Sequence, residues 1–358
     1  MKRSKSPISA SEIRRKKKEG ITKEKEKEAS KPEYDGNEEV MISTGSTLLD
    51  LEISGGRKRG GGIPGGIFVE IMGQKKTGKT ILLCELAGAA QRAGGDISFK
   101  DPEARLNIQF ALMFDLVLNK EQYGIPDTVT EVFKWIRAWK PKPKNKKAIN
   151  GIFADSLAAL STDLEMDKEE GDKMGMRRAK EFSEELRKTC RILTNRNWLL
   201  VGSNQLRQTG NSFGEKYKSP GGEAPAYYAS LRLKTRLKQK IKKEKTINGK
   251  SYEAPEGILA EVEVYDSSVW RPYGKAEIYI IFDYGIDDIR SNLQYLKRFH
   301  GTDKYTLDGD QNLYQSMNDS IKVIEEKGLE KELKEAVINA WETVQKAFQT
   351  TRKPKRRE

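Results

Sequence analysis

The chain has 358 residues and a formal net charge of +13, a length that suits one large domain with appendages or two domains. The basic balance points to a polyanionic partner, while a single histidine and two cysteines argue against His-based zinc clusters, Ser-His triads and a disulfide framework. No apolar run approaches the roughly 18 residues of a membrane-spanning helix, so no membrane partner is expected.

The first 38 residues are polar and strongly charged. A helix could begin at Ser11, but the segment has too few apolar residues to fold alone and lacks the apolar part of a secretory signal. We interpret residues 1–38 as a basic arm for oligomerisation and expect a folded core over 39–286. A helical C-terminal region should cover 287–349, followed by a basic tail over 350–358.

Apolar, β-branched runs in the core alternate with helical patterns. This alternation predicts an α/β fold with a mostly parallel central sheet and right-handed crossovers, flanked by helices. The expected strands are Ile67–Met72, Asp96–Lys100, Ala148–Ala154, Trp198–Ser203, a hairpin, and Ala276–Phe282.

The stretch "GQKKTGKT" has the spacing of a phosphate-binding loop. The apolar run "GIFVEIMG" precedes it, and the helical pattern "TILLCELAGAAQRAGG" follows, so strand, glycine loop and helix come in the required order. The alternative, a lysine-rich surface turn, does not explain this context. The predicted nucleotide-binding residues are Gly73, Gln74, Lys75, Lys76, Thr77, Gly78, Lys79 and Thr80.

Carboxylates follow two of the other expected strands. Asp155 ends the run "AINGIFAD", where it could hold Mg²⁺ or, alternatively, cap the next helix. Asp101 and Glu103 lie in "ISFKDPEARLN", where either could orient the water that attacks the γ-phosphate. The local pattern leaves the choice between these two open.

A long glycine-rich segment, "SNQLRQTGNSFGEKYKSPGG", follows the strand that ends near Ser203. Long irregular loops in compact domains are usually functional or disordered. Its cations and aromatic rings suit single-stranded nucleic acid, and the alternative is a mobile surface loop.

These motifs occur in the order and spacing of the RecA-family recombinases, which the chain resembles from about Ile42 to Ile286. The shared stretches include "ISTGSTLLD", "DPEARL", "ADSLAAL", "GDKMG", "SNQLR" and "GGEAPAYYASLRL". The resemblance implies a RecA-like core and an ATP- and Mg²⁺-dependent recombination protein. Such a protein hydrolyses ATP in response to DNA, forms helical filaments on single-stranded DNA and exchanges strands with homologous duplex DNA.

The resemblance also assigns roles by position. Lys79 matches the phosphate ligand, and Thr80 with Asp155 matches the Mg²⁺ site. Glu103, rather than Asp101, matches the catalytic glutamate. Two further positions complete the implied ATP site: Phe110 where an aromatic ring stacks on adenine, and Gln205 where a side chain couples the γ-phosphate to the DNA loop.

Two segments match the family's DNA-binding loops, over residues 169–178 and 207–222. The implied DNA contacts are Lys173, Met174, Gly175, Arg177, Arg178, Arg207, Phe213, Gly214, Lys216, Lys218, Gly221 and Gly222.

The sequence departs from the family where bacterial members carry two lysines that reach across the filament interface. Asp266 and Ser268 occupy those positions here, and the nearby cations are Arg271 and Lys275. Either one of these substitutes acts in trans or turnover is weak. The departure keeps open a non-catalytic DNA-binding or mediator paralogue, and a hexameric DNA motor is a third reading. The resemblance and the sparse cysteines imply the cytoplasm of a bacterial or phage-infected cell.

Overall fold

The computed structural model describes residues 40–162, 174–208, 217–218, 224–307, 313, 315–350 and 352. Its centre is a nine-stranded sheet with the order β13-β12-β11-β10-β3-β7-β6-β4-β5. The strands are β3 (Phe68–Gly73), β4 (Ile97–Lys100), β5 (Tyr123–Gly124), β6 (Gly151–Ala154), β7 (Leu199–Gln205), β10 (Leu231–Ile247), β11 (Lys250–Ser267), β12 (Lys275–Ile281) and β13 (Gly285–Ile286).

Parallel pairing runs from β10 through β3, β7, β6 and β4 to β5, whereas β10 through β13 are joined by antiparallel pairs. The prediction of a mostly parallel α/β sheet flanked by helices is therefore confirmed. Most predicted strands begin one to three residues early, because the run of apolar side chains starts before the ladder of backbone hydrogen bonds.

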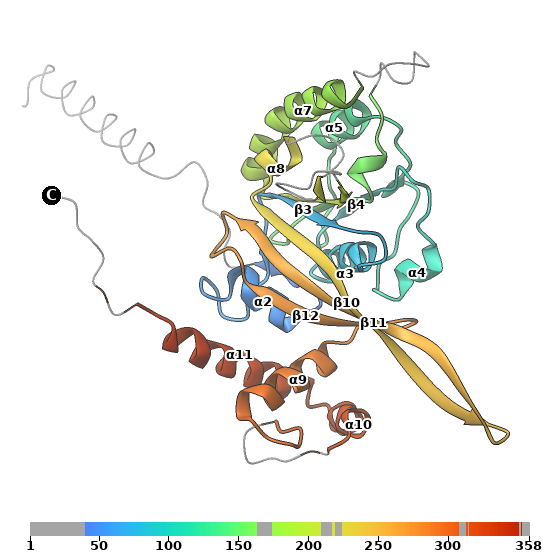
Figure 1. The fold of residues 1–358 in the computed structure, drawn as a ribbon. Helices are drawn as coiled ribbons and strands as arrows, with labels where there is room; N and C mark the ends of the chain where they lie inside the picture. Colours follow the sequence, from blue (N-terminus) through green and yellow to red (C-terminus); the bar gives the residue numbers. More distant parts are fainter. Residues whose placement is uncertain are drawn as a thin grey trace, which may run out of the picture.

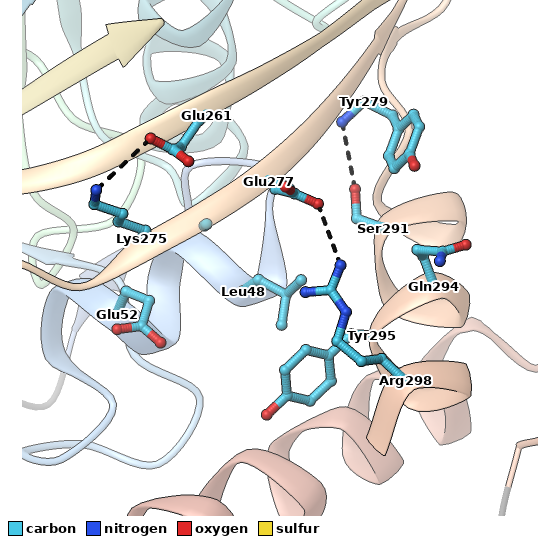
Figure 2. A pocket seen from close by; sticks show the side chains of 11 residues that line it. Leu48, Glu52, Glu261, Lys275, Glu277, Tyr279, Ser291, Gln294, Tyr295 and Arg298 are labelled. Carbon is cyan, nitrogen blue, oxygen red and sulfur yellow. Dashed lines mark hydrogen bonds and ion pairs between the residues drawn. The ribbon is translucent and has the colours of Figure 1, made fainter. Parts of the chain in front are cut away.

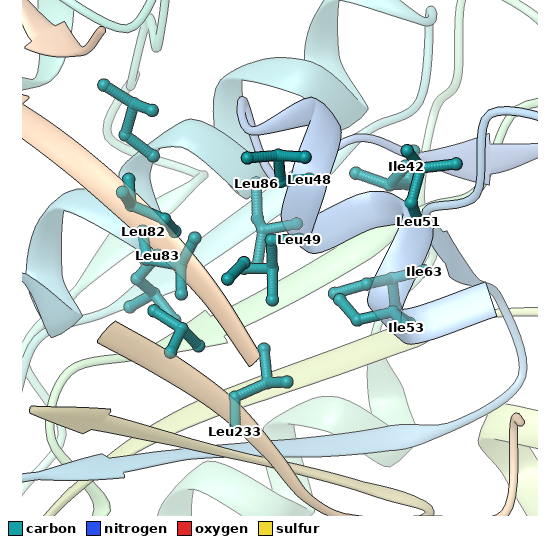
Figure 3. Packing of buried hydrophobic residues seen from close by; sticks show 14 of the residues in the cluster. Ile42, Leu48, Leu49, Leu51, Ile53, Ile63, Leu82, Leu83, Leu86 and Leu233 are labelled. Atoms are coloured by element: carbon teal, nitrogen blue, oxygen red, sulfur yellow. The ribbon is translucent and has the colours of Figure 1, made fainter. Parts of the chain in front are cut away.

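Helices cover both faces of the sheet (Figure 1). One apolar cluster joins α2 (Thr47–Ser54), α3 (Lys79–Arg92) and the C-terminal helices to the sheet; Figure 3 shows its leucine and isoleucine side chains interdigitating. The second cluster joins α5 (Val129–Ala138) and α7 (Met174–Arg196) to the other face. Along β3, Val69 and Ile71 belong to the first cluster and Phe68 to the second, as the alternation of a strand requires.

Shorter elements complete this part of the chain. They are β1 (Met41–Ile42), β2 (Ile63–Pro64), α4 (Ile108–Leu112), a 3₁₀ turn η1 (Leu157–Ala159), β8 (Arg207–Gln208), β9 (Tyr217–Lys218) and α8 (Ala224–Tyr228).

Strands β10 and β11 form a hairpin much longer than the rest of the sheet (Figure 1). Asn248 and Gly249 form its two-residue turn, with φ of 51° and 73°. Positive φ at both positions is the requirement of a type I′ turn, which matches the twist of the flanking strands and explains the Asn-Gly pair. The turn therefore fixes which residues of the two strands lie opposite each other.

Three helices follow the sheet: α9 (Asp288–His300), α10 (Met317–Lys327) and α11 (Glu330–Ala347). Helix α11 is tied to the α2 region by polar contacts as well as by apolar packing. Trp341 Nε1 donates a hydrogen bond to Glu52 at 2.8 Å, and Arg59 Nη1 pairs with Glu335 at 2.6 Å. No helix in the described ranges is long and apolar enough to cross a bilayer.

Both cysteines are free thiols inside helices. Cys84 is buried in α3, and Cys190 is partly buried in α7. Burial raises the pKa of the Cys190 thiol to about 11 and raises the pKa of Cys84 further. Neither cysteine contributes a covalent link to the fold.

Candidate nucleotide and DNA site

The predicted phosphate loop connects the end of β3 to the start of α3, as the sequence indicated. Gly78 caps α3 with φ of 89°, and a Cβ there would lie 2.4 Å from Ile280 Cδ1, so both backbone and space favour glycine. The N-terminus of α3 contributes positive potential at this loop.

Lys79 folds back onto the phosphate loop. Its Nζ donates to the carbonyl oxygens of Gly73 at 3.0 Å and Gln74 at 2.7 Å. Burial lowers the pKa of Lys79, and the carboxylates of Asp155 and Glu103 partly oppose that shift. The ammonium is thus held at the mouth of the loop, where a phosphate would satisfy it better than carbonyl groups do.

Thr80 and Asp155 meet directly. Thr80 Oγ1 donates to Asp155 Oδ2 at 2.6 Å, and the hydroxyl of Ser203 donates to the other carboxylate oxygen. Ser156 rather than Asp155 precedes the 3₁₀ turn, so Asp155 is not its N-cap residue. Hydroxyl and carboxylate oxygens are the donors that Mg²⁺ prefers, so these residues fit the predicted metal.

The two candidate carboxylates after β4 have different surroundings. Asp101 is buried, and its Oδ2 accepts from the backbone N–H groups of Arg105 and Leu106, both at 2.8 Å, and from the Tyr123 hydroxyl at 2.9 Å. These bonds hold the turn that carries Glu103, so the geometry gives Asp101 a structural role.

Glu103 points into the cluster around Asp155. Its Oε1 accepts from Ser156 Oγ at 2.8 Å and Gln205 Nε2 at 3.4 Å, and its Oε2 pairs with Arg105 Nη1 at 2.7 Å. Glu103 therefore lies between the Mg²⁺ candidates and the end of β7. Sequence reasoning missed Ser156 and Ser203 as partners; their only signal is that they are polar residues beside Asp155 and at the end of an apolar strand.

Gln205 links the phosphate loop to the predicted DNA loop. In the parallel ladder it lies opposite Gly73, and the following Leu206 N–H donates to the Gly73 carbonyl at 3.1 Å. The chain then enters β8, where Arg207 pairs with Lys218 of β9. Arg207 and Lys218 of the predicted loop are thereby brought together where the chain leaves the nucleotide cluster.

The remaining predicted contact residues lie in α4, in α7 or outside the described residues. Phe110 lies in α4, where its ring meets Phe114 edge-on at 5.2 Å. Met174 and Gly175 begin α7, and in the same helix Arg178 Nη1 donates to the Ala158 carbonyl at 3.4 Å. Six predicted DNA contacts lie outside the described residues: Lys173, Phe213, Gly214, Lys216, Gly221 and Gly222.

The turn that contains Arg271 lies at the opposite edge of the sheet from the phosphate loop. Ser267 of β11 pairs with Leu231 of β10, and Leu231 pairs with Val69 near the start of β3. The phosphate loop begins at the other end of β3. Asp266 and Ser268 are both exposed there. The Arg271 guanidinium lies over the Trp270 ring, 5.4 Å from its centroid.

Lys275 borders a cavity of about 270 Å³ between α2, β12 and α9 (Figure 2). Its ammonium lies 3.9 Å from Glu261 and 4.0 Å from Glu263. The Arg298 guanidinium lies 3.7 Å from Glu277 across the same cavity. The cavity is separate from the nucleotide cluster, and Lys275 already faces two carboxylates of its own chain.

The sequence was compared with known proteins. Residues 21–287 match the RecA N-terminal domain family. The chain belongs to the RecA family. It is 32% identical over 298 residues to Protein RecA of Borrelia duttonii, covering 82% of this chain and 78% of that protein. Protein RecA of Crocosphaera subtropica is 30% identical over 290 residues, covering 80% and 78% respectively.

Membership of the RecA family associates the chain in general terms with ATP, Mg²⁺, DNA binding and recombination. The matched range includes the sheet and the nucleotide cluster and ends at residue 287, immediately before α9. The C-terminal helices therefore lie beyond the matched RecA domain.

Proposed function

We propose that the protein is a DNA-dependent ATPase that polymerises on single-stranded DNA and promotes homologous pairing and strand exchange. The observation that carries this proposal is the contact between Glu103 and Gln205, which joins the hydrolytic cluster to the strand that leads into the DNA loop. A γ-phosphate that moved Gln205 would also move the loop, and DNA on the loop would in turn reposition Glu103.

In this mechanism ATP and Mg²⁺ occupy the loop between β3 and α3. Mg²⁺ neutralises phosphate charge when it is bound beside Thr80 and Asp155. Lys79 leaves the backbone carbonyls to hold the phosphates, and Glu103 orients the attacking water and accepts its proton. Phe110 is proposed to stack on the base.

Two measurements test the proposal. ATP hydrolysis should rise when single-stranded DNA is added, and negative-stain images with an ATP analogue and DNA should show helical filaments. DNA-independent hydrolysis would contradict the coupling. Closed rings and unwinding of a tailed duplex would favour the hexameric motor.

A second candidate is a paralogue that binds DNA and ATP without productive turnover. The exposed Asp266 and Ser268 favour it, since neither can neutralise charge on a neighbour's γ-phosphate. The parent protein distinguishes the two readings: measurable DNA-stimulated turnover supports the recombinase, whereas ATP binding without turnover supports the paralogue.

If a cation acts in trans, the surroundings favour Arg271 over Lys275. Lys275 faces Glu261 and Glu263, whereas the described contact of Arg271 is with the Trp270 ring, which leaves its donors available. Arg271 also lies in the exposed turn at the edge remote from its own phosphate loop.

A further inference from the structure

The β10–β11 hairpin ends in a free-standing ribbon, residues 242–255, which we call the finger. Strand β10 pairs with β3 only as far as Thr235, and β11 pairs with β12 only from Gly257 onward. Ile247, at the tip, lies six residues beyond Ile241, the partner of Gly257. At ~3.3 Å per residue the finger reaches about 20 Å past its last supporting strand. Figure 1 shows it projecting from the body of the molecule, away from α7.

The register gives the finger two different faces, because residues directly opposite each other share a face and successive residues alternate. Lys245 lies opposite Tyr252, and Ile247 lies opposite Lys250. This basic face consists of Lys243, Lys245, Ile247, Lys250, Tyr252 and Ala254. The other face consists of Lys242, Glu244, Thr246, Ser251, Glu253 and Pro255.

On the second face, each charged side chain has a partner on the same face. Lys242 pairs with Glu253 at 2.7 Å, and the Ser251 hydroxyl donates to Glu244. With two glutamates and one lysine, this face carries a net negative charge.

The basic face is not neutralised in this way. Lys243 reaches Glu256 at 2.8 Å, but Lys245 and Lys250 have no ion-pair partner within the described residues. Beside them Tyr252 is 54% exposed and Ile247 52% exposed. Uncompensated cations next to an exposed aromatic ring characterise a nucleic-acid surface.

The base of the hairpin has different electrostatics. Arg236 pairs with Glu261 at 2.7 Å, and Lys238 pairs with Glu277 at 2.8 Å. These two cations at the base are neutralised by ion pairs, whereas Lys245 and Lys250 near the tip are not. Lysines on an unpaired strand can also serve only to prevent association with other strands. That role would not require the lysines to share one face with exposed apolar side chains.

We propose that the basic face of the finger binds duplex DNA. A two-stranded ribbon has a shape that the major groove admits. Lys243 and Lys245 are spaced by about 7 Å along β10, roughly twice the 3.4 Å axial spacing of phosphates on one strand. Lys245 and Lys250 contact phosphates, while Tyr252 and Ile247 pack against the groove. The inference rests on the proposed function only in taking DNA as the partner.

The test compares two double variants with the parent. Lys245→Ala with Lys250→Ala removes two charges from the basic face. The matched control, Lys240→Ala with Lys242→Ala, also removes two charges, one from the opposite face of the finger and one from β10 just before the finger. Binding of a short fluorescent duplex is measured by anisotropy across a salt series, alongside a single-stranded oligonucleotide. The basic-face variant should lower the salt slope for the duplex by about two. The control should match the parent, and both variants should keep the parental melting temperature.

If the parent binds duplex DNA, three results would overturn the inference. Equal loss in the two double variants would indicate a general effect of net charge. Unchanged duplex binding by the basic-face variant would remove the finger as a contact, and loss confined to the single-stranded oligonucleotide would assign it to the other substrate. A parent that binds neither DNA would contradict the proposed function as well, whereas parental binding with an unaffected basic-face variant contradicts the inference alone.

Discussion

At the scale of single residues, the two carboxylates after β4 show how position separates structure from chemistry. Asp101 is buried and accepts from two backbone N–H groups and a tyrosine hydroxyl, whereas Glu103 contacts Ser156 and Gln205 at the nucleotide cluster. Substitutions at these two positions should therefore have different consequences.

Glu103→Gln should bind ATP normally but hydrolyse it at least a hundredfold more slowly, since an amide cannot accept the proton of the attacking water. Asp101→Asn is the comparison: loss of acceptor capacity for buried donors should lower the free energy of unfolding by about 1–3 kcal/mol. Nucleotide titration, single-turnover hydrolysis and urea unfolding measure these effects. Parental hydrolysis by Glu103→Gln would remove the assignment.

Asp50 provides a test by pH. It is buried in α2, where desolvation raises the pKa of its carboxyl from 3.8 to about 6, although Ser43 and Thr44 donate hydrogen bonds that oppose the shift. The raised pKa means that the folded state binds the proton more tightly. The resulting stability is present below pH 3.8 and lost as pH rises through about 6.

The prediction concerns the difference in unfolding free energy between the parent and Asp50→Asn, which cannot titrate. Relative to Asp50→Asn, the parent should lose up to about 3 kcal/mol of unfolding free energy as the pH rises from 4 to 7. Urea unfolding across that range measures it. A difference that stays constant with pH would show that the Asp50 carboxyl keeps an ordinary pKa.

At the scale of elements, the turn between β11 and β12 carries the interface prediction. Arg271→Ala should lower DNA-stimulated hydrolysis at least tenfold, about 1.4 kcal/mol of barrier, because a cation that stabilises developing charge is lost. Lys275→Ala should have a smaller effect, since Lys275 faces Glu261 and Glu263 of its own chain. ATP binding by the monomer should be unchanged in both. Parental turnover by Arg271→Ala would exclude this turn as the source of a trans cation.

The elements also show what sequence could predict. The phosphate loop was recognisable because its glycines, its lysine and the hydrophobic patterns of the strand and helix on either side are local features of the sequence. The local pattern left the choice between Asp101 and Glu103 open, and only the family resemblance favoured Glu103. The physical reason depends on a tyrosine from β5 and on backbone groups that only the folded turn presents. A hairpin was expected, but not its reach or its two faces: three register shifts interrupt the alternation along β10 and β11.

At the scale of the whole molecule, a site shared between subunits can be tested by mixing inactive proteins. Lys79→Ala lacks the phosphate ligand but offers a normal Arg271, and Arg271→Ala has the reverse defect. In randomly mixed head-to-tail filaments, about a quarter of the interfaces would join an intact Lys79 to an intact Arg271. Hydrolysis on DNA should recover to roughly that fraction of the parental rate. No recovery would place both residues in one subunit's site.

The two thiols described in the fold have a practical consequence for following such assemblies in solution. The thiolate is the reactive form, and burial keeps the pKa of Cys190 near 11 and that of Cys84 higher still, so both should react slowly with maleimides near neutral pH. The two natural cysteines should therefore take up little label, so a cysteine introduced at a chosen site can be labelled selectively. A single Ser251→Cys substitution would place a fluorophore at the tip of the finger, where its emission could follow the arrival of duplex in real time.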